Sequence, residues 1–234
     1  MFTKSALYYD VIYSFKDYQA ETHRLLELIG DHLLSGGDRL LDVACGTGKH
    51  LQLLKEKFEV EGLDLSPELL KIARGRTPDV PYHHADMMDF DLGREFDIVT
   101  CLFSSIGYAK TLENLNRAVK CMANHLLAGG ILVIEPWFTP DSWNVGGVHA
   151  NFIDEPELKI ARINTSSIEG RLSYFDFHYL IGTPEGVEYF IERHELGLFE
   201  MEEMYEALKG SGLEVTYDEK GLTGRGLYIG RKPK

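Results

Sequence analysis

The sequence predicts an α/β fold, in which a doubly wound, Rossmann-like parallel sheet carries an antiparallel β meander inserted over its ligand site. Short aliphatic runs alternate with amphipathic helical patterns between residues 20 and 135, which is typical of parallel sheets covered by helices. A glycine-rich turn follows the first aliphatic run, where such folds bind ligands. Residues 138 to 198 lack a helical pattern and contain extended runs separated by turn residues.

The alternating part of the chain begins with an amphipathic helix and then enters a buried strand. Ser66 suits the N-cap of a later helix and Pro67 suits its first turn, so this pair marks a helix start. Ala128, Gly129 and Gly130 are expected to stop the last helix of this part. The expected helices are 20–34, 50–57, 66–74 and 111–127, and the expected extended runs are 40–43, 60–64, 80–84, 95–104 and 131–135.

The rest of the chain predicts a second unit. Extended runs at 148–153, 159–167, 171–181 and 187–198 indicate a meander, and a helix at 201–209 and a hairpin at 213–217 and 226–229 follow it. Two domains are therefore expected: residues 1–137 with 199–234 as the cofactor-binding domain, and 138–198 as an inserted, substrate-binding β subdomain. Residues 1–18 hold four tyrosines and two phenylalanines, and form either a helix over the core or an aromatic lid that excludes water.

Composition limits the class of protein. The formal net charge of −13 argues against nonspecific nucleic-acid binding, which needs a dense basic surface. The three cysteines form no C-x-x-C pair, and no acid or histidine cluster has the spacing of metal ligands, so no metal is expected. No run of eighteen apolar residues and no basic–apolar leader is present. We therefore expect a cytoplasmic protein with no membrane partner.

The glycine turn lies in the stretch LLDVACGTGKHL, residues 40–51. Gly46 and Gly48 let the backbone turn sharply and let a ligand approach it closely. Dinucleotides and S-adenosylmethionine (SAM) are both bound in this way, but the dinucleotide motif needs a third glycine where this chain has Leu51. The turn therefore disfavours a nicotinamide dinucleotide.

Two acidic residues follow at strand ends. Asp64 ends the second strand, where its two oxygens can accept hydrogen bonds from both ribose hydroxyls of an adenosine. Asp86 can accept from the adenine amino group while Met87 packs on the ring. Either acid alone could be an ordinary strand-end carboxylate, but the ordered set predicts SAM as cofactor and S-adenosylhomocysteine (SAH) as product. The series D-x-A-C-G-T-G, G-L-D-L-S and A-D-M-x-D-F resembles the class I SAM-dependent methyltransferases over about residues 36–137.

Further stretches resemble a narrower group, the sugar-nucleotide N,N-dimethyltransferases that make desosamine and mycaminose on a dTDP carrier. The matching pieces include LFSSIGY at 102–108, VIEPWF at 133–138, RHELGLF at 193–199 and LTGRGLYIG at 222–230. The chain departs from the group at Asp64, where a glutamate is usual, and at Tyr108, where a histidine can occur.

This resemblance implies three sets of site residues. The cofactor set is Tyr9, Ala44, Cys45, Gly46, Gly48, Asp64, Leu65, Asp86, Met87 and Leu102. The catalytic set is Ser105, Tyr108, His178 and His194, and the remaining acceptor-binding residues are Tyr18, Trp137 and Arg225. Arg225 is implied to bind the pyrophosphate of the acceptor, and it lies between two glycines that suit close approach of an anion.

The expected reaction is a direct methyl transfer from SAM to a small molecule, with N-methylation of an amino-sugar nucleotide as the first hypothesis. The protein has to align the two substrates and exclude water, and a histidine or a water could take the amine proton. The alternatives are an N- or O-methyltransferase of another small metabolite and a SAM-binding module without turnover. The partners expected are a small-molecule acceptor, no nucleic acid, and either no second subunit or an identical one.

Overall fold

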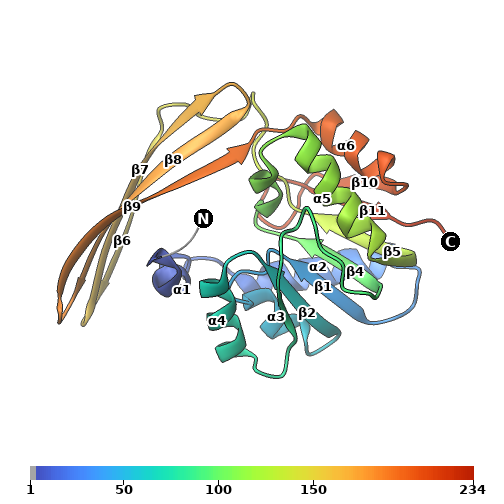
Figure 1. Ribbon diagram of the computed structural model, residues 1–234, viewed down its shortest axis with the longest axis horizontal. Helices are drawn as coiled ribbons and strands as arrows, with labels where there is room; N and C mark the ends of the chain where they lie inside the picture. The colour runs from blue at the N-terminus through green and yellow to red at the C-terminus, as the bar shows by residue number, and fades with distance from the viewer. Residues whose placement is uncertain (1–3) are drawn as a thin grey trace.

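The computed structural model describes residues 4–234, which form two β-sheets. A seven-stranded sheet has the order β10-β11-β5-β4-β1-β2-β3, and a four-stranded sheet has the order β6-β7-β8-β9. Figure 1 shows the four-stranded sheet standing beside the α/β unit, with helix α1 between them. The α/β class and the inserted antiparallel meander are both confirmed.

The seven-stranded sheet is parallel from β3 to β5 and ends in an antiparallel hairpin. Its strands read as continuous apolar runs because helices cover both faces. The pairing of β10 with β11 confirms the predicted closing hairpin. The strands are β1 (Arg39–Val43), β2 (Glu59–Asp64), β3 (Tyr82–His84), β4 (Phe96–Cys101), β5 (Leu126–Ile134), β10 (Glu214–Asp218) and β11 (Leu227–Arg231).

Consecutive strand residues supply two separate cores, one on each face of this sheet. Leu41 packs with helices α5 and α6, whereas its neighbour Leu40 packs with α2, α3 and α4. This alternation follows from the pleat of a strand, which turns successive side chains to opposite faces. The helices are α2 (Tyr18–His32), α3 (Lys49–Leu54), α4 (Pro67–Arg76), α5 (Leu112–Asn124) and α6 (Met201–Gly210).

Two predicted boundaries are wrong. The strand expected over 95–104 ends at Cys101, because Phe103 and Ser104 have left-handed φ values of 51° and 61° and start the 3-10 turn η2 (Ser105–Ala109). The helix expected to run to Leu127 ends at Asn124, so Gly129 and Gly130 lie inside strand β5 instead of stopping a helix. The Gly129 carbonyl accepts the N–H groups of Leu34 and Ser35, which joins this strand to the end of α2.

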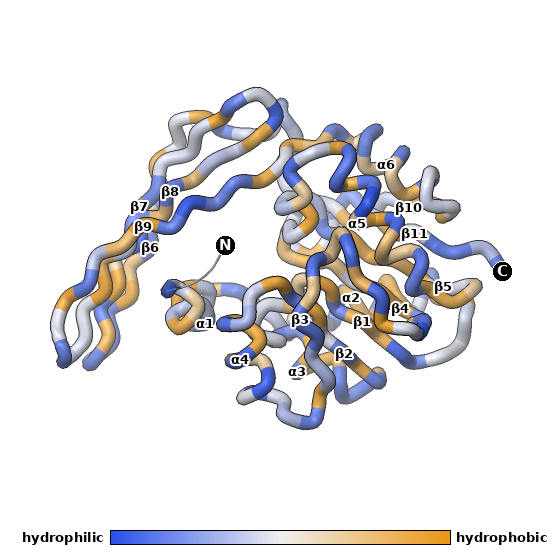
Figure 2. The backbone as a smooth tube through the Cα atoms, in the orientation of Figure 1, coloured by the Kyte–Doolittle hydropathy of each residue, from blue (hydrophilic) through white to orange (hydrophobic). Residues whose placement is uncertain are grey.

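The four-stranded sheet has two different faces. The inner face carries the buried side chains of Ile160, Tyr179 and His194, and the outer face carries large apolar side chains that are exposed. Figure 2 shows hydrophobic segments along these strands as well as in the α/β unit. The strands are β6 (Val148–Glu155), β7 (Leu158–Glu169), β8 (Leu172–Thr183) and β9 (Gly186–Gly197). The exposed apolar side chains of the outer face are Val148, Phe152, Ile163, Leu180, Val187, Tyr189 and Ile191.

The N-terminal segment, made of η1 (Lys4–Tyr8) and α1 (Tyr9–Ile12), contacts both units. Ile12 packs into the inner face of the four-stranded sheet. Asp10 accepts a hydrogen bond of 2.8 Å from Thr47 in the glycine turn and pairs with Arg76 of α4. The segment therefore bridges the two units, as a lid would. Residues 1–3 of the predicted lid lie outside the described residues. Within residues 4–234, no helix is long and apolar enough to span a membrane.

Candidate active site

A cavity of about 520 Å³ opens at the C-terminal ends of β1, β2 and β3, where the predicted cofactor acids lie. Asp64 forms its floor and is 8% exposed. Its two oxygens accept the backbone N–H groups of Gly46 at 2.7 Å and Ser66 at 2.8 Å. Burial raises the pKa of Asp64, while these N–H donors favour the charged form. The carboxylate is thus fixed with its remaining lone pairs available to ribose hydroxyls.

The far end of this cavity is built by the loop after β3. Asp86 accepts the backbone N–H of Met88 at 2.9 Å, which fixes the direction of its carboxylate. Met87 and Leu65 also line the cavity and supply apolar surface for a flat ring. An acid beside apolar walls matches an adenine with its amino group, so the residues present fit the adenosine part of SAM.

A small cavity of about 40 Å³ adjoins the first one and shares Tyr9 and Gly46 with it. Ala44, Cys45 and Leu102, which the resemblance assigns to the SAM site, line it. Tyr18 lines this cavity too, whereas it was predicted to face the acceptor. Gly48 lines none of the three cavities; it caps α3 with a left-handed φ of 73°, where an added Cβ would meet the Tyr82 hydroxyl at 2.6 Å.

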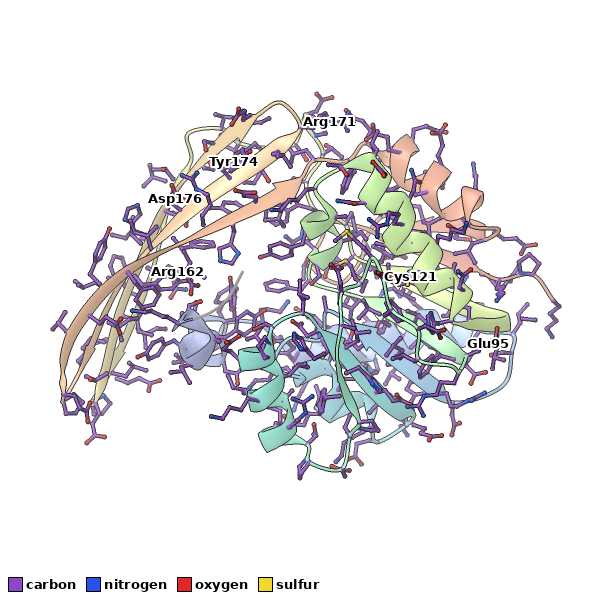
Figure 3. All side chains as sticks on the ribbon, in the orientation of Figure 1. Glu95, Cys121, Arg162, Arg171, Tyr174 and Asp176 are labelled. Carbon is purple, nitrogen blue, oxygen red and sulfur yellow. The ribbon has the colours of Figure 1, made fainter. Side chains whose placement is uncertain are left out.

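A third cavity, again of about 520 Å³, lies between the inner face of the four-stranded sheet and the α/β unit. Its walls are aromatic, with Trp137 and Trp143 both packed against Phe175 at ring-centroid distances of 5.6 and 5.2 Å. Figure 3 shows Arg162 on the side of the sheet that faces the α/β unit. The Arg162 guanidinium donates to the Tyr13 hydroxyl at 3.0 Å. An aromatic cavity with a few cations suits a ligand that combines flat rings with anionic groups.

The three cavities meet at a small set of side chains. Tyr9 and Ser105 line all three, and Tyr108 lines the two large ones. The Ser105 hydroxyl donates to the Leu102 carbonyl at 2.8 Å, which fixes it at this junction. Burial raises the pKa of Tyr9 and of Tyr108, so both hydroxyls stay protonated at neutral pH. Among residues 4–234, these three are shared by the linings of the first and third cavities, so ligands in the two cavities can meet beside them.

His194 stands behind the junction on the inner face of β9 and is 1% exposed. Its Nδ1 lies 2.7 Å from the Tyr108 hydroxyl. Burial lowers the pKa of His194 to about 4. The positive charge of Arg162 also lowers this pKa, whereas the negative charge of Glu192 raises it. The imidazole is therefore neutral at pH 7, and its hydrogen bond with Tyr108 fixes the phenol oxygen beside the cavities.

Arg225 lines the third cavity with its side chain 23% exposed. Its guanidinium carbon lies 5.9, 5.7 and 5.8 Å from the ring centroids of Phe103, Trp137 and Phe138. Gly224 and Gly226 on either side have left-handed φ values of 84° and 76°. The aromatic rings restrain the cation, and Gly224 has open space where a Cβ would stand, so this arrangement suits an anionic group.

His178 does not belong to this site. It is exposed on the outer face of β8, where its Nδ1 lies 2.6 Å from the Tyr189 hydroxyl. It alternates with Phe177 and Tyr179, which face inward, so one step along the strand turns His178 away from the cavity. We therefore remove it from the catalytic set.

The sequence reasoning missed several residues of the third cavity, among them Arg162 and Asn164. The two-residue period of a strand is the signal that could have placed both on the face of Ile160, although their polarity favoured a solvent-facing side. His50, which lines the small cavity and bonds to Glu21 at 2.9 Å, carried no comparable signal because a buried helix histidine is commonly structural.

Comparison with known proteins agrees with this geometry. The methyltransferase domain family matches residues 40–130. The chain is 41% identical to a dTDP-3-amino-3,6-dideoxy-α-D-glucopyranose N,N-dimethyltransferase of Streptomyces fradiae, over 95% of this chain and 88% of that one. Among solved structures it is similar to DesVI of Streptomyces venezuelae, with 39% identity, a TM-score of 0.92 and full coverage of both chains. SAM-bound CalS10, an amino pentose methyltransferase from Micromonospora echinaspora, is 36% identical with a TM-score of 0.86, and the match covers 99% of this chain and 98% of that one.

Proposed function

Because the chain belongs to the class I SAM-dependent methyltransferases, in the family that includes the dTDP-amino-sugar N,N-dimethyltransferases, we propose that it methylates the amino group of an amino sugar carried on a nucleoside diphosphate. The observation that carries this proposal is the junction of the cavities at Tyr9 and Ser105, with Arg225 in the cavity opposite the cofactor acids. Such a layout gives one cavity to the cofactor and another to an acceptor with an anionic end.

The cofactor is SAM, which supplies a methyl group already activated on a positively charged sulfur. Asp64 holds the ribose, and Asp86 and Met87 hold the adenine. Ala44, Cys45 and Leu102 hold the methionine end, with Tyr18 above it. The lid residue Tyr9 covers the point where the cavities join and keeps water out.

The acceptor is held at two ends in this proposal. Arg225 binds the diphosphate, for which its planar fork of N–H donors is suited. Trp137 and the other rings of the third cavity cover the nucleoside and sugar. The amino group then comes to Ser105 and Tyr108, next to the methyl donor. Holding both partners in line supplies most of the rate enhancement that such a displacement needs.

The amine must be neutral when it attacks. A histidine with a pKa of about 4 is too weak a base to hold the proton of an alkylammonium, so His194 acts on Tyr108 and does not itself deprotonate the amine. The Tyr108 oxygen, held in place by its hydrogen bond with His194, accepts a hydrogen bond from the amine N–H and orients the nitrogen lone pair. Burial of Tyr9 and Tyr108 at this junction shows that it is desolvated, and desolvation disfavours the ammonium form of the bound acceptor.

The two predicted domains correspond to the two ligands in this proposal. We assign cofactor binding to residues 1–137 and 199–234, and acceptor binding to the inserted residues 138–198. The apolar outer face of the inserted sheet, which includes Phe152 at 68% and Val187 at 74% exposure, favours a homodimer over a monomer. Sedimentation of the wild type and of a Phe152→Ser variant tests this; a monomeric wild type would contradict it.

The experiment that tests the function is a turnover screen with methyl-labelled SAM. Acceptors include nucleotide-linked amino sugars, free amino sugars, glycine-like amines and catechols, and products are identified by mass. Label transfer to the nitrogen of a nucleotide-linked amino sugar is the expected result. Transfer only to another metabolite favours the second reading, an N- or O-methyltransferase with a different acceptor, and binding of SAM without any turnover favours a non-catalytic module.

A further inference from the structure

Glu135 is a buried carboxylate for which neither the cofactor nor the acceptor accounts. It follows strand β5 directly and its side chain is 1% exposed. Its Oε2 accepts the backbone N–H of Phe103 at 2.7 Å, and its Oε1 accepts the Thr223 hydroxyl at 2.6 Å. A buried charge is tolerated only where such partners hold it, so both contacts are structural requirements of this residue.

The first contact holds a strained turn. Phe103 and Ser104 have φ values of 51° and 61°, and two adjacent non-glycine residues in this region are stable only when their surroundings fix them. Glu135 fixes the first residue, and the Ser104 hydroxyl, which donates to the Pro136 carbonyl at 2.6 Å, fixes the second. This turn carries Ser105, the side chain that lines all three cavities.

The second contact leads to the acceptor side. Thr223, which donates to Glu135, accepts a hydrogen bond of 3.3 Å from Nε of Arg225. The Arg225 guanidinium also comes within 3.9 Å of Glu135 itself. Phe103 also contacts Arg225 directly, because its ring centroid lies 5.9 Å from the Arg225 guanidinium carbon. A continuous chain of contacts therefore runs from Arg225 through Thr223 and Glu135 to the turn.

We infer that Glu135 is a positioning residue that couples Arg225 to the turn carrying Ser105, so that an acceptor anchored at Arg225 has its reacting end in register with the methyl donor. The inference rests on the proposed function, since it requires an acceptor held by an anionic end. Because one rigid carboxylate contacts both segments, any movement of the Arg225 loop is transmitted to the turn, and the reverse. The residue touches neither reacting group.

The informative variant is Thr223→Val, which keeps the bulk of the side chain and removes the hydroxyl between Arg225 and Glu135. Thr223→Ser, which keeps the hydroxyl, is the matched control. With a nucleotide-linked amino sugar, Thr223→Val should lower kcat roughly tenfold, the scale of one lost hydrogen bond to a charged group, while Thr223→Ser stays close to the wild type. The Kd for SAH should not change in either variant.

The free amino sugar distinguishes positioning from mere support of the fold. It lacks the anionic end, does not engage Arg225, and should be methylated equally by the wild type and by Thr223→Val. A purely structural role in the turn lowers the rates with both acceptors alike, and that outcome overturns the inference. So does an unchanged kcat with the nucleotide-linked acceptor.

Amide hydrogen exchange at Phe103 tests the coupling without any acceptor. Protection of this amide should fall several-fold in Thr223→Val, remain in Thr223→Ser, and fall furthest in Glu135→Ala, where its acceptor is lost. If the wild type fails to methylate nucleotide-linked amino sugars, the proposed function fails and the coupling is judged on exchange alone. Equal protection at Phe103 in the wild type and in Thr223→Val overturns the coupling, whatever the acceptor.

Discussion

The Tyr108 hydroxyl forms a hydrogen bond of 2.7 Å with Nδ1 of the buried His194, at the point where the first cavity meets the third. Burial raises the pKa of the phenol and lowers the pKa of the imidazole to about 4. Neither group is charged at neutral pH. The pair is therefore a fixed hydrogen-bonding surface for an amine, and it lies against aromatic rings that exclude water.

Tyr108→Phe removes the hydroxyl from this pair and leaves the ring in place. We expect kcat to fall by roughly tenfold, the scale of one lost hydrogen bond to the reacting amine, with the Kd for SAH unchanged. Steady-state kinetics together with calorimetric titration of SAH check this. An unchanged kcat would mean that the hydroxyl does not contact the reacting amine.

His178→Ala is the control for the histidine assignments. Its side chain lies on the outer face of β8 beside Tyr189, so its loss should leave both kcat and the KM of the acceptor unchanged. A large loss of kcat in this variant would return His178 to the active site.

The buried His194 predicts how stability depends on pH. Its folded pKa of about 4 lies below its unfolded value of 6.5, so the unfolded chain binds more protons between these values and stability falls as the pH drops through this window. The wild type should lose about 2–3 kcal/mol more than His194→Gln between pH 7 and pH 4. Urea unfolding at a series of pH values measures the difference, and parallel curves for the two proteins would show that His194 does not titrate in this way.

Asp64→Ala should lower the affinity for SAM by about 1.5–3 kcal/mol, the scale for losing hydrogen bonds to a charged group. The carboxylate also holds the N–H groups of Gly46 and Ser66, so part of the loss comes from a looser glycine turn. Calorimetric titration of a variant that keeps the circular dichroism spectrum of the wild type measures it. Wild-type affinity in that variant would place the adenosine elsewhere.

Asp10 connects the N-terminal segment to the glycine turn and to α4, since it pairs with Thr47 and Arg76. In the proposed function this segment covers the cofactor, so Asp10→Asn, which removes the charge from this contact, should speed the release of SAH several-fold through a loss of about 1 kcal/mol. Stopped-flow displacement measures the rate. Asp79→Asn, which breaks the exposed pair with Lys55 away from the cavities, is the matched control and should release SAH at the wild-type rate.

The sequence predicted the order of strands and helices because each buried strand and each helix has its own periodic pattern. It also predicted the cofactor acids, since Asp64 and Asp86 follow strands whose ends meet at one edge of a parallel sheet. These are local signals, and the structure brings both acids to one cavity.

The errors have a common physical cause. His178 and His194 look alike in the sequence, and only the register of β8 against β9 decides which one faces inward. The left-handed turn at Phe103 and Ser104 contains no glycine that would predict it from the sequence. It is stabilised instead by a hydrogen bond to Glu135, which is distant in the sequence. Tertiary contacts of this kind cannot be read from local patterns.

In the proposed function, Arg225 anchors the nucleoside diphosphate of the acceptor while the amino group reacts at Ser105 and Tyr108. The most direct measurement compares wild type and Arg225→Ala with a dTDP-linked amino sugar and with the free amino sugar, following methylated product by mass. Arg225→Ala should cost about 2–3 kcal/mol in kcat/KM with the nucleotide-linked acceptor and nothing with the free sugar. Arg225→Lys should recover only part of the loss. Equal losses with both acceptors, or no loss with either, would contradict the account.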